Sequence, residues 1–372
     1  MNIKIKLRII LFLCFLLINY ANAAEIIVNG SIDELYDDNI NSSSTNPESD
    51  WITSMTLGVT ARSELRQLDV NLSGNINQRY SVKHEESNAN YQDMMISINK
   101  SFSENVSLSI TDSLQHYPES KSFSTLFGRS EENTGYLSNS FSSNLTVYVS
   151  KEIFLGGVYT YSTMNNDSNT IPDSVLHNPG GNIGYIFNSA NTVRVGYLYT
   201  LMKYNNDSHS RGDRGYIEYV KLFTPQLQSV LQGGYDYITT EDGQRLSSMY
   251  MFSLIDDIDN KNQMNITYIK ENTISNISND IFENWRVEGS LRREINERTR
   301  ISMSLFYGQG TYQLSRVTEK LRGASAALAF TVTEFLSFTF GYTYVWRNSI
   351  APASGETAYN RNQYSIGLSA VY

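Results

Sequence analysis

The residues best suited to act on a solute are arginines and glutamates that recur at even spacing. They alternate with apolar residues in one segment, and further arginines fall on the polar face of other segments by the same parity. In an extended chain, residues two apart point to the same side. These side chains would therefore form a charged row able to guide an acidic solute. The candidates are Arg194, Arg286, Glu288, Arg292, Glu294, Arg298, Arg300 and Arg347.

The same residues support a second interpretation, which we favour. Glu288 and Glu294 lie within reach of the arginines, so the row would be an ion-pair network that braces a wall. The chain as a whole is acidic, with a formal net charge of -9. This balance argues against a nucleic-acid partner, because such proteins carry basic patches.

Alternation of apolar and polar residues extends far beyond the charged row. It predicts strands with one apolar face and one polar face, each near the 9–11 residues that a tilted strand needs to cross a bilayer. The mean hydropathy of -0.34 is too polar for a bundle of membrane helices, whereas a barrel wall is half polar. The clearest segments are 68–77, 106–113, 193–201, 301–307 and 336–346.

The connections between these segments fall into two lengths. Eight short polar turns alternate with nine longer loops rich in Asn, Asp, Ser and Gly. Outer-membrane barrels combine short periplasmic turns with long external loops. The sequence thus predicts an all-β, transmembrane, antiparallel up-and-down barrel of about eighteen strands, with both termini in the periplasm. Sixteen strands is the alternative, because 26–36 and 138–149 alternate poorly.

The two ends of the chain carry targeting signals. Lys4, Lys6 and Arg8 precede an apolar run, and Ala21-Asn22-Ala23 fits a cleavage site, so we expect a signal peptide over 1–23 and the barrel over 24–372. Cys14, the only cysteine, lies in that run, so the mature barrel is predicted to lack disulfides. The final segment alternates up to an aromatic last residue, as in the closing strand of an outer-membrane barrel. We interpret it as an insertion signal made of Tyr364, Ile366, Leu368, Ala370 and Tyr372.

Two features of the predicted barrel have alternative interpretations. Tyr and Trp residues near the predicted strand ends favour an interfacial girdle, with a sugar-stacking platform as the alternative. The longest loop, Tyr117–Asn133, either folds into the lumen or lies over the rim. Asp112 breaks the alternation between Ile110 and Leu114, which places it near the outer rim or indicates a parity error.

Catalytic and metal-binding signals are weak. The four histidines fall in or near predicted external loops, without the spacing of a nucleophile and its base. The Asp37-Asp38-Asn39 run lacks the spacing of a calcium loop, and we interpret it as a solvated turn. No cofactor is predicted, and a rim hydrolase is the least favoured function. The histidines are His84, His116, His177 and His209.

Both ends of the mature chain resemble a family of outer-membrane porins linked with exopolysaccharide and PEP-CTERM loci. The resemblance rests on segments 34–40, 45–59 and 359–369. It implies a barrel that aids export or assembly of a surface polysaccharide, acidic or neutral, together with periplasmic export proteins. Outer-membrane lipid and the barrel assembly machinery are the other expected partners. A structural or adhesive barrel, whose loops bind polysaccharide or a partner, is the alternative.

Overall fold

The structure is a computed structural model that describes residues 24–117, 127, 135–167, 171–241, 243–259, 261–275, 280–351 and 355–372. The signal-peptide prediction for 1–23 lies outside these residues. No helix in the described ranges is long and apolar enough to cross a membrane. The elements are β1 (Ala24–Asp37), β2 (Asp50–Leu65), β3 (Leu68–Ser81), η1 (Glu85–Ser87), β4 (Ala89–Ser103), β5 (Val106–Tyr117), β6 (Tyr136–Tyr148), β7 (Ile153–Asn166), β8 (Ser174–Asn188), β9 (Asn191–Tyr204), β10 (His209–Leu222), β11 (Leu227–Thr240), β12 (Gly243–Asp259), β13 (Asn262–Ile274), β14 (Ile281–Asn296), β15 (Thr299–Tyr312), β16 (Thr318–Thr333), β17 (Leu336–Ala351) and β18 (Gly355–Val371).

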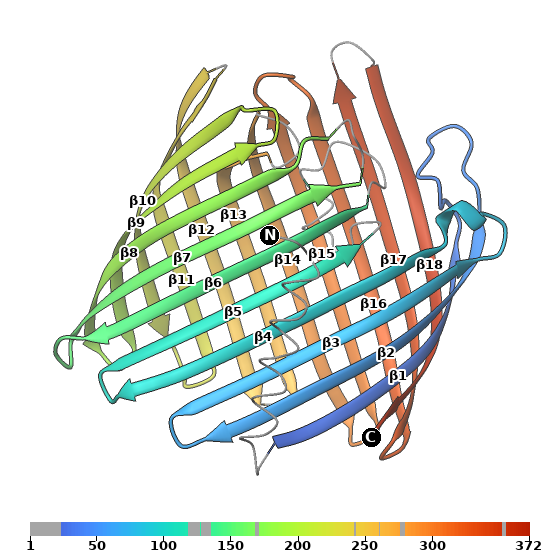
Figure 1. Ribbon diagram of the computed structural model, residues 1–372, viewed down its shortest axis with the longest axis horizontal. Coiled ribbons are helices and arrows are strands. Elements are labelled where there is room, and N and C mark those ends of the chain that lie inside the picture. The colour runs from blue at the N-terminus through green and yellow to red at the C-terminus, as the bar shows by residue number, and fades with distance from the viewer. Residues whose placement is uncertain are drawn as a thin grey trace.

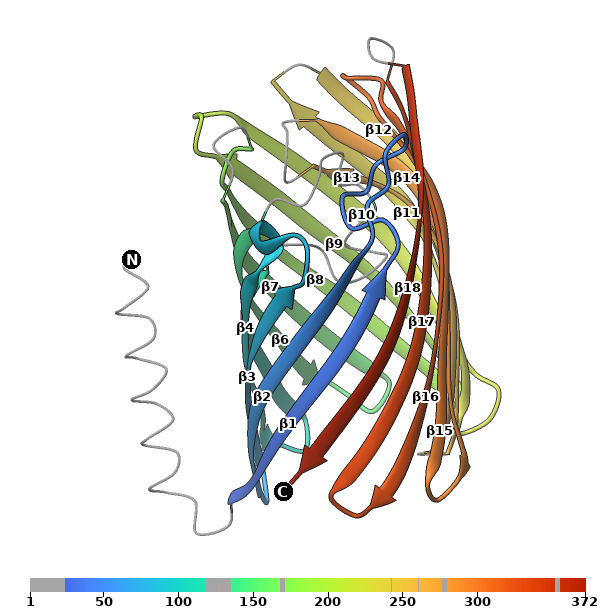
Figure 2. The same cartoon turned by 90° about the vertical axis from the view of Figure 1, so that its right-hand side faces the viewer.

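The strands form one closed antiparallel sheet. Each strand pairs with its neighbours in the chain, and β1 pairs with β18 from Asn29↔Val371 to Asp37↔Gln363. The strands are strongly tilted around the barrel, as Figure 1 shows. In Figure 2, β1 and β18 lie side by side, and the C-terminus is at the end that carries the short turns. The predicted eighteen-strand antiparallel barrel is confirmed.

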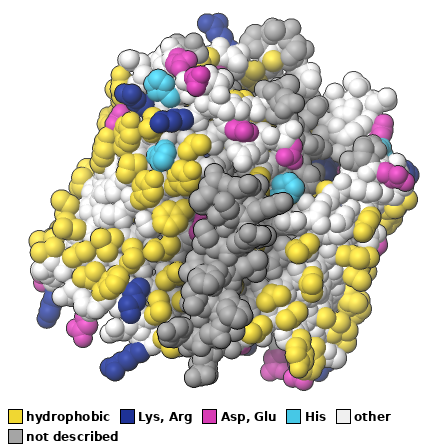
Figure 3. Space-filling model, in the orientation of Figure 1, with side chains coloured by type: hydrophobic (Ala, Val, Ile, Leu, Met, Phe, Trp, Pro, Cys, Tyr) yellow, Lys and Arg dark blue, Asp and Glu magenta, His cyan; other side chains and the backbone are white. Residues whose placement is uncertain are grey.

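Alternation along the strands separates an apolar outside from a polar inside. On β2, Met55, Leu57 and Val59 are exposed on the outer wall, whereas the side chain of Ile52 is fully buried on the other face. Hydrophobic side chains cover much of the wall in Figure 3, and charged ones gather toward its two rims. Such an exterior suits lipid, and a closed sheet leaves no unpaired edge in the hydrocarbon.

The two poorly alternating segments are strands β1 and β6. In β6, Asn139 interrupts the apolar outer row between Leu137 and Phe141, which explains its weak pattern. Its Nδ2 donates to Oδ1 of Asp112 at 2.8 Å. Asp112 pairs in register with Phe141, so it lies on the outer face. The sequence alternation of β5 therefore assigned its inner and outer positions correctly.

The final strand closes the barrel with the residues interpreted as an insertion signal. Tyr364, Ile366 and Leu368 are exposed along the outer face of β18. Tyr372 follows the strand, and its N–H donates to Val28 O at 2.8 Å. The row therefore lies on the lipid-facing side of the seam with β1.

Candidate functional site

One part of the inner wall is lined mainly by residues with hydroxyl and amide groups. Asp112, on the outer face, is the only Asp, Glu, Lys or Arg in β5 to β8, so the luminal rows of these four strands are uncharged. Hydroxyl residues face one another in the strand register, as in Ser113↔Ser140 and Thr111↔Ser142. We name this surface, the luminal face of β5 to β8, the neutral wall.

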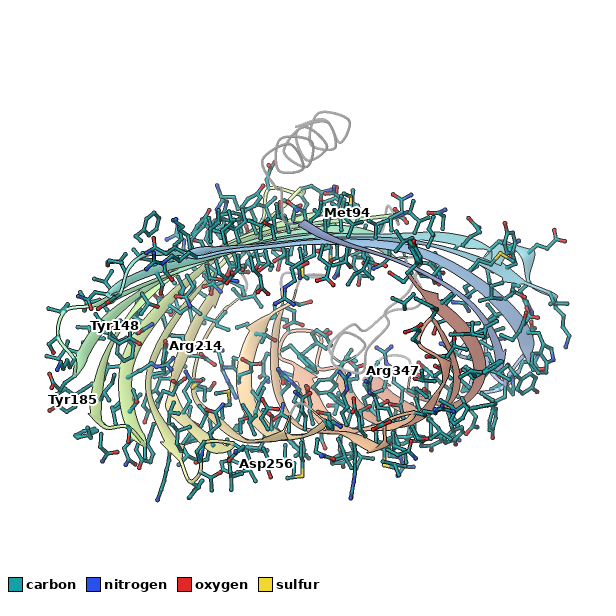
Figure 4. The ribbon with its side chains drawn as sticks, turned by 90° about the horizontal axis from the view of Figure 1, so that it is seen from below. Met94, Tyr148, Tyr185, Arg214, Asp256 and Arg347 are labelled. Atoms are coloured by element: carbon teal, nitrogen blue, oxygen red, sulfur yellow. The ribbon has the colours of Figure 1, made fainter. Side chains whose placement is uncertain are left out.

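The rest of the inner wall carries ion pairs. Arg194 lies 3.3 Å from Glu218, Arg300 lies 2.8 Å from Glu294, and Arg347 lies 2.7 Å from Glu319. Glu319 and Arg347 are nearly fully buried. Figure 4, viewed along the barrel axis, places Arg214 and Arg347 toward the inside and Tyr185 on the outside. The arginine candidates in these pairs are matched by carboxylates, as the bracing interpretation expects.

Four predicted charge candidates, including the ion pair of Glu294 with Arg300, lie at the end of the barrel that carries the short turns. Arg292 is exposed in β14 and lines a lower luminal cavity of about 640 Å³ with Asp257. Arg298 lies in the turn between β14 and β15, one residue before the strand on which we expected it. It is exposed beside Glu294 and Arg300 at the lower mouth. The strand begins later because the Arg298 N–H donates to Asn296 Oδ1 to form the turn.

The barrel wall bends inward at the upper end of β13. The ladder between β12 and β13 stops at Tyr250↔Lys270. Beyond that point β12 continues to Gly243, paired only with β11, and β13 continues to Ile274, paired only with β14. At this level the two strands are no longer edge to edge in one sheet. We call residues 271–275 the inner segment.

Contacts of the inner segment place it against the luminal faces of other strands. The Asn272 backbone N–H donates to Asp236 Oδ2 of β11 at 3.0 Å, and its side-chain Nδ2 donates to Ser247 Oγ of β12. Farther round the barrel, the Tyr204 hydroxyl of β9 donates to the Ser275 carbonyl. Because these partners belong to β9, β11 and β12, the inner segment crosses in front of their luminal faces and narrows the lumen.

Glu271 is the charged centre of this arrangement. Its two oxygens accept from Arg214 Nη2 at 3.0 Å and from Arg286 Nη1 at 2.9 Å. Arg214 also binds Asp236 at 2.6 Å, and Arg286 also binds Glu288 at 3.0 Å. We call these five residues the luminal charge network. It ties β13 to β10 on one side and to β14 on the other, and the inward bend follows from these ties.

Three members of the network were not among the candidates from sequence. Asp236 stands between Tyr235 and Tyr237, and Arg214 stands three residues before the outward Ile217, so the alternation marks both as luminal. Glu271 belongs to a run of polar residues without clear alternation. Only the fold brings it to arginines on two other strands.

Phe127 enters the lumen from the longest predicted loop. Tyr117 and Phe127 are the only residues of 117–133 in the described ranges, so the loop prediction otherwise lies outside them. Phe127 is buried against the inner faces of β14 and β15, with ring centroids 5.2 Å from Phe282 and 5.5 Å from Phe306. Its chain connects β5 and β6, on the other side of the eighteen-strand ring. This placement agrees with the infolded alternative.

The inner segment, Phe127 and the strand faces enclose a cavity of about 440 Å³. Its apolar lining includes Leu198, Met202, Ile238 and Phe282, and its polar lining includes Arg214, Asp236, Glu271, Asn272 and Arg286. Small-molecule sites commonly occupy about 300–1,000 Å³. We call this space the luminal cavity.

The histidines lie apart from the luminal cavity. His84, in the loop after β3, has Nε2 beside Glu48 at 2.5 Å and Nδ1 beside Asp50 at 3.0 Å. The Glu48 and Asp50 carboxylates raise the pKa of His84 above its ordinary 6.5. Ser81 Oγ donates to Asp50 rather than to the imidazole, so this cluster does not form a nucleophile–base pair. No group of three or more His, Cys, Asp or Glu in the described ranges could hold a metal ion.

Aromatic rings form a row on the outer face across the closing seam. Tyr36 lies 5.1 Å from Trp51 and 6.4 Å from Tyr364 between ring centroids, and Tyr364 lies 5.1 Å from Tyr342. Trp51 and Tyr364 are half exposed on the wall rather than turned into the lumen. The outward position agrees with the girdle interpretation for these rings.

Comparison with known proteins finds similarity in overall shape alone. No family model and no curated protein matches the sequence, so the porin-family resemblance stays a prediction. The outer membrane protein opdK from Pseudomonas aeruginosa is 10% identical, with a TM-score of 0.49, over 94% of this chain and 99% of that chain. OccAB3 from Acinetobacter baumannii is 8% identical, with a TM-score of 0.47, over 94% and 100%. The siderophore receptor PirA from P. aeruginosa is 8% identical, with a TM-score of 0.44, over 93% and 80%.

Proposed function

We propose that this protein is a porin-type diffusion channel of the outer membrane, with the chain termini on the periplasmic side. The proposal is carried by a closed eighteen-strand barrel whose outer face is apolar and whose luminal face is polar. Barrels of about 16–18 strands leave room for water along the axis. The luminal charge network and Phe127 would then set the narrowest part of the path.

The solute that best fits the lumen is uncharged and polar. The neutral wall offers hydroxyl and amide groups over four adjacent strands, while the arginines in the described ion pairs have carboxylate partners. Hydroxyl and amide groups both donate and accept, as do the hydroxyls of a saccharide. We therefore extend the proposal to passage of a surface polysaccharide or its fragments, with the expected periplasmic export proteins as partners.

Liposome swelling would test the channel and its preference. Proteoliposomes in an isotonic solution of a neutral disaccharide should swell, because the solute enters through the pore and water follows. Swelling in an anionic sugar of similar size should be slower. Protein-containing vesicles that swell no faster than empty ones would overturn the channel proposal, and equal or faster entry of the anion would overturn the preference.

A further inference from the structure

We propose that the luminal cavity is a binding subsite for one ring of a neutral sugar chain, so that the channel holds its solute while it passes. The inference rests on the proposed function and names a specific place within it. The cavity lies at the inner segment, where the described chain crosses in front of the wall. A solute moving along the lumen would meet it at the narrowing.

The electrostatics of the cavity argue for an uncharged ligand. Its two arginines, Arg214 and Arg286, are held by three carboxylates, those of Asp236, Glu271 and Glu288. The network thus carries one more negative than positive charge, so an anion would meet net repulsion. Side chains of Arg214 and Arg286 nevertheless keep about a quarter and a fifth of their surface exposed (25% and 20%). Their guanidinium N–H groups and the carboxylate oxygens of the network can supply donors and acceptors for hydroxyls.

An unmatched acceptor beside the cavity points to a hydroxyl donor. Asn272 lines the cavity and is 3% exposed. Its Nδ2 donates to Ser247 Oγ, whereas its Oδ1 is buried and has no hydrogen-bond partner among the described residues. A buried acceptor without a donor costs about 1–3 kcal/mol. A hydroxyl that enters the cavity would relieve this cost after a small shift of the amide.

The apolar side of the cavity fits the C–H face of a sugar ring. Phe282 lies between Phe127 and Tyr312, with ring centroids 5.2 Å and 4.6 Å away. Leu198, Met202 and Ile238 add further apolar lining beside the polar groups. A pyranose ring offers both kinds of surface, with C–H groups on its faces and hydroxyls around its edge. An inorganic ion or a purely apolar ligand would leave part of the lining unmatched.

Block of single-channel current by a neutral six-unit gluco-oligosaccharide would test the subsite. Asn272→Ala removes the unmatched amide, and Phe282→Leu removes the ring while keeping most of the bulk. Each should raise the concentration for half-block about tenfold. Asn265→Ala is the matched control, because Asn265 lies lower on β13 and lines the separate lower cavity. The control should be blocked like the wild type.

The outcomes separate this inference from the proposed function. Three outcomes would overturn the subsite while leaving the channel intact. The open channels could show no block, both cavity variants could be blocked like the wild type, or an oligogalacturonate could block more tightly. A protein that carries no current would overturn the channel itself. In unheated gels, a cavity variant that migrates like the folded wild-type protein would be shown to be folded. Its loss of block would then report weaker binding.

Discussion

Arg361 and Asp37 join the last strand of the barrel to the first, with Arg361 Nε 2.7 Å from Asp37 Oδ2. The carboxylate is fully buried and also accepts from Gln363 Nε2 at 2.9 Å and from the Asn39 N–H at 3.0 Å. Asp37 and Gln363 form the last pair of the β1–β18 ladder. Above this point β18 continues without β1, so the ion pair fastens the upper end of the closing seam.

Asp37→Asn should weaken closure of the barrel. The variant leaves Arg361 without its charged partner, and removal of one member of a buried pair costs about 3–5 kcal/mol. We expect the temperature at which the folded form disappears in heat-modifiability gels to fall markedly. Arg62→Gln is the control, because its pair with Glu64 is about 60% exposed on both sides (59% and 61%). Equal losses in the two variants would contradict this role for the seam.

Glu271→Gln should release the inner segment. The neutral amide loses both charged contacts, to Arg214 and to Arg286, and leaves two partly buried guanidinium groups less well matched. We expect a loss of about 1–3 kcal/mol in stability and a larger or more variable single-channel conductance. Glu294→Gln, whose partner Arg300 is half exposed, should change stability by less than about 1 kcal/mol. An unchanged conductance in Glu271→Gln would show that the network does not set the constriction.

Gly308→Val should displace Phe127 from its place on the inner wall. A Cβ at Gly308 would lie 3.0 Å from the Phe127 ring and 3.2 Å from Arg286 Cβ, so the ring must move. We expect higher single-channel conductance, because the ring leaves the inner wall. Gly157→Val is matched in size and meets nothing within 4 Å. It should behave as the wild type, and an unchanged conductance in Gly308→Val would refute the seating of Phe127.

The loop contact of His84 should depend on pH. The Glu48 and Asp50 carboxylates raise the pKa of His84 in the folded loop. Protonation of the imidazole therefore stabilises the folded loop relative to the opened one. The stability that the protonated His84 gives the folded loop is therefore complete below the ordinary pKa of 6.5. It is lost as pH rises through the raised pKa. Hydrogen exchange of residues 82–88, corrected for intrinsic rates, should show protection that declines over that range. His84→Gln should remove the pH dependence, and its persistence would point to another group.

Much of the barrel could be predicted from sequence because its cause is local. The outward row Tyr364, Ile366 and Leu368 is set by alternation within one strand, and lipid outside with water inside selects the same pattern in most others. The weak pattern of β6 could not be resolved in this way, since Asn139 on the outer face depends on Asp112 of β5. Pairing across strands, not propensity, decides such a segment.

The inward bend and the cavity could not be predicted, because their causes are distant in the chain. Glu271 meets Arg214, 57 residues away, and Phe127 reaches Phe282 from a loop between strands on another part of the ring. Parity indicates that Arg214 and Asp236 face the lumen, but it cannot say at what height they meet Glu271. That height depends on register and tilt over many strands.

Conductance of the purified wild-type protein in a planar lipid bilayer tests the central claim most directly. The account predicts discrete, stable openings with a weak preference for cations, since the luminal charge network carries one more negative than positive charge. A protein that inserts, retains the β-sheet circular-dichroism spectrum of a barrel and yet passes no current would contradict it.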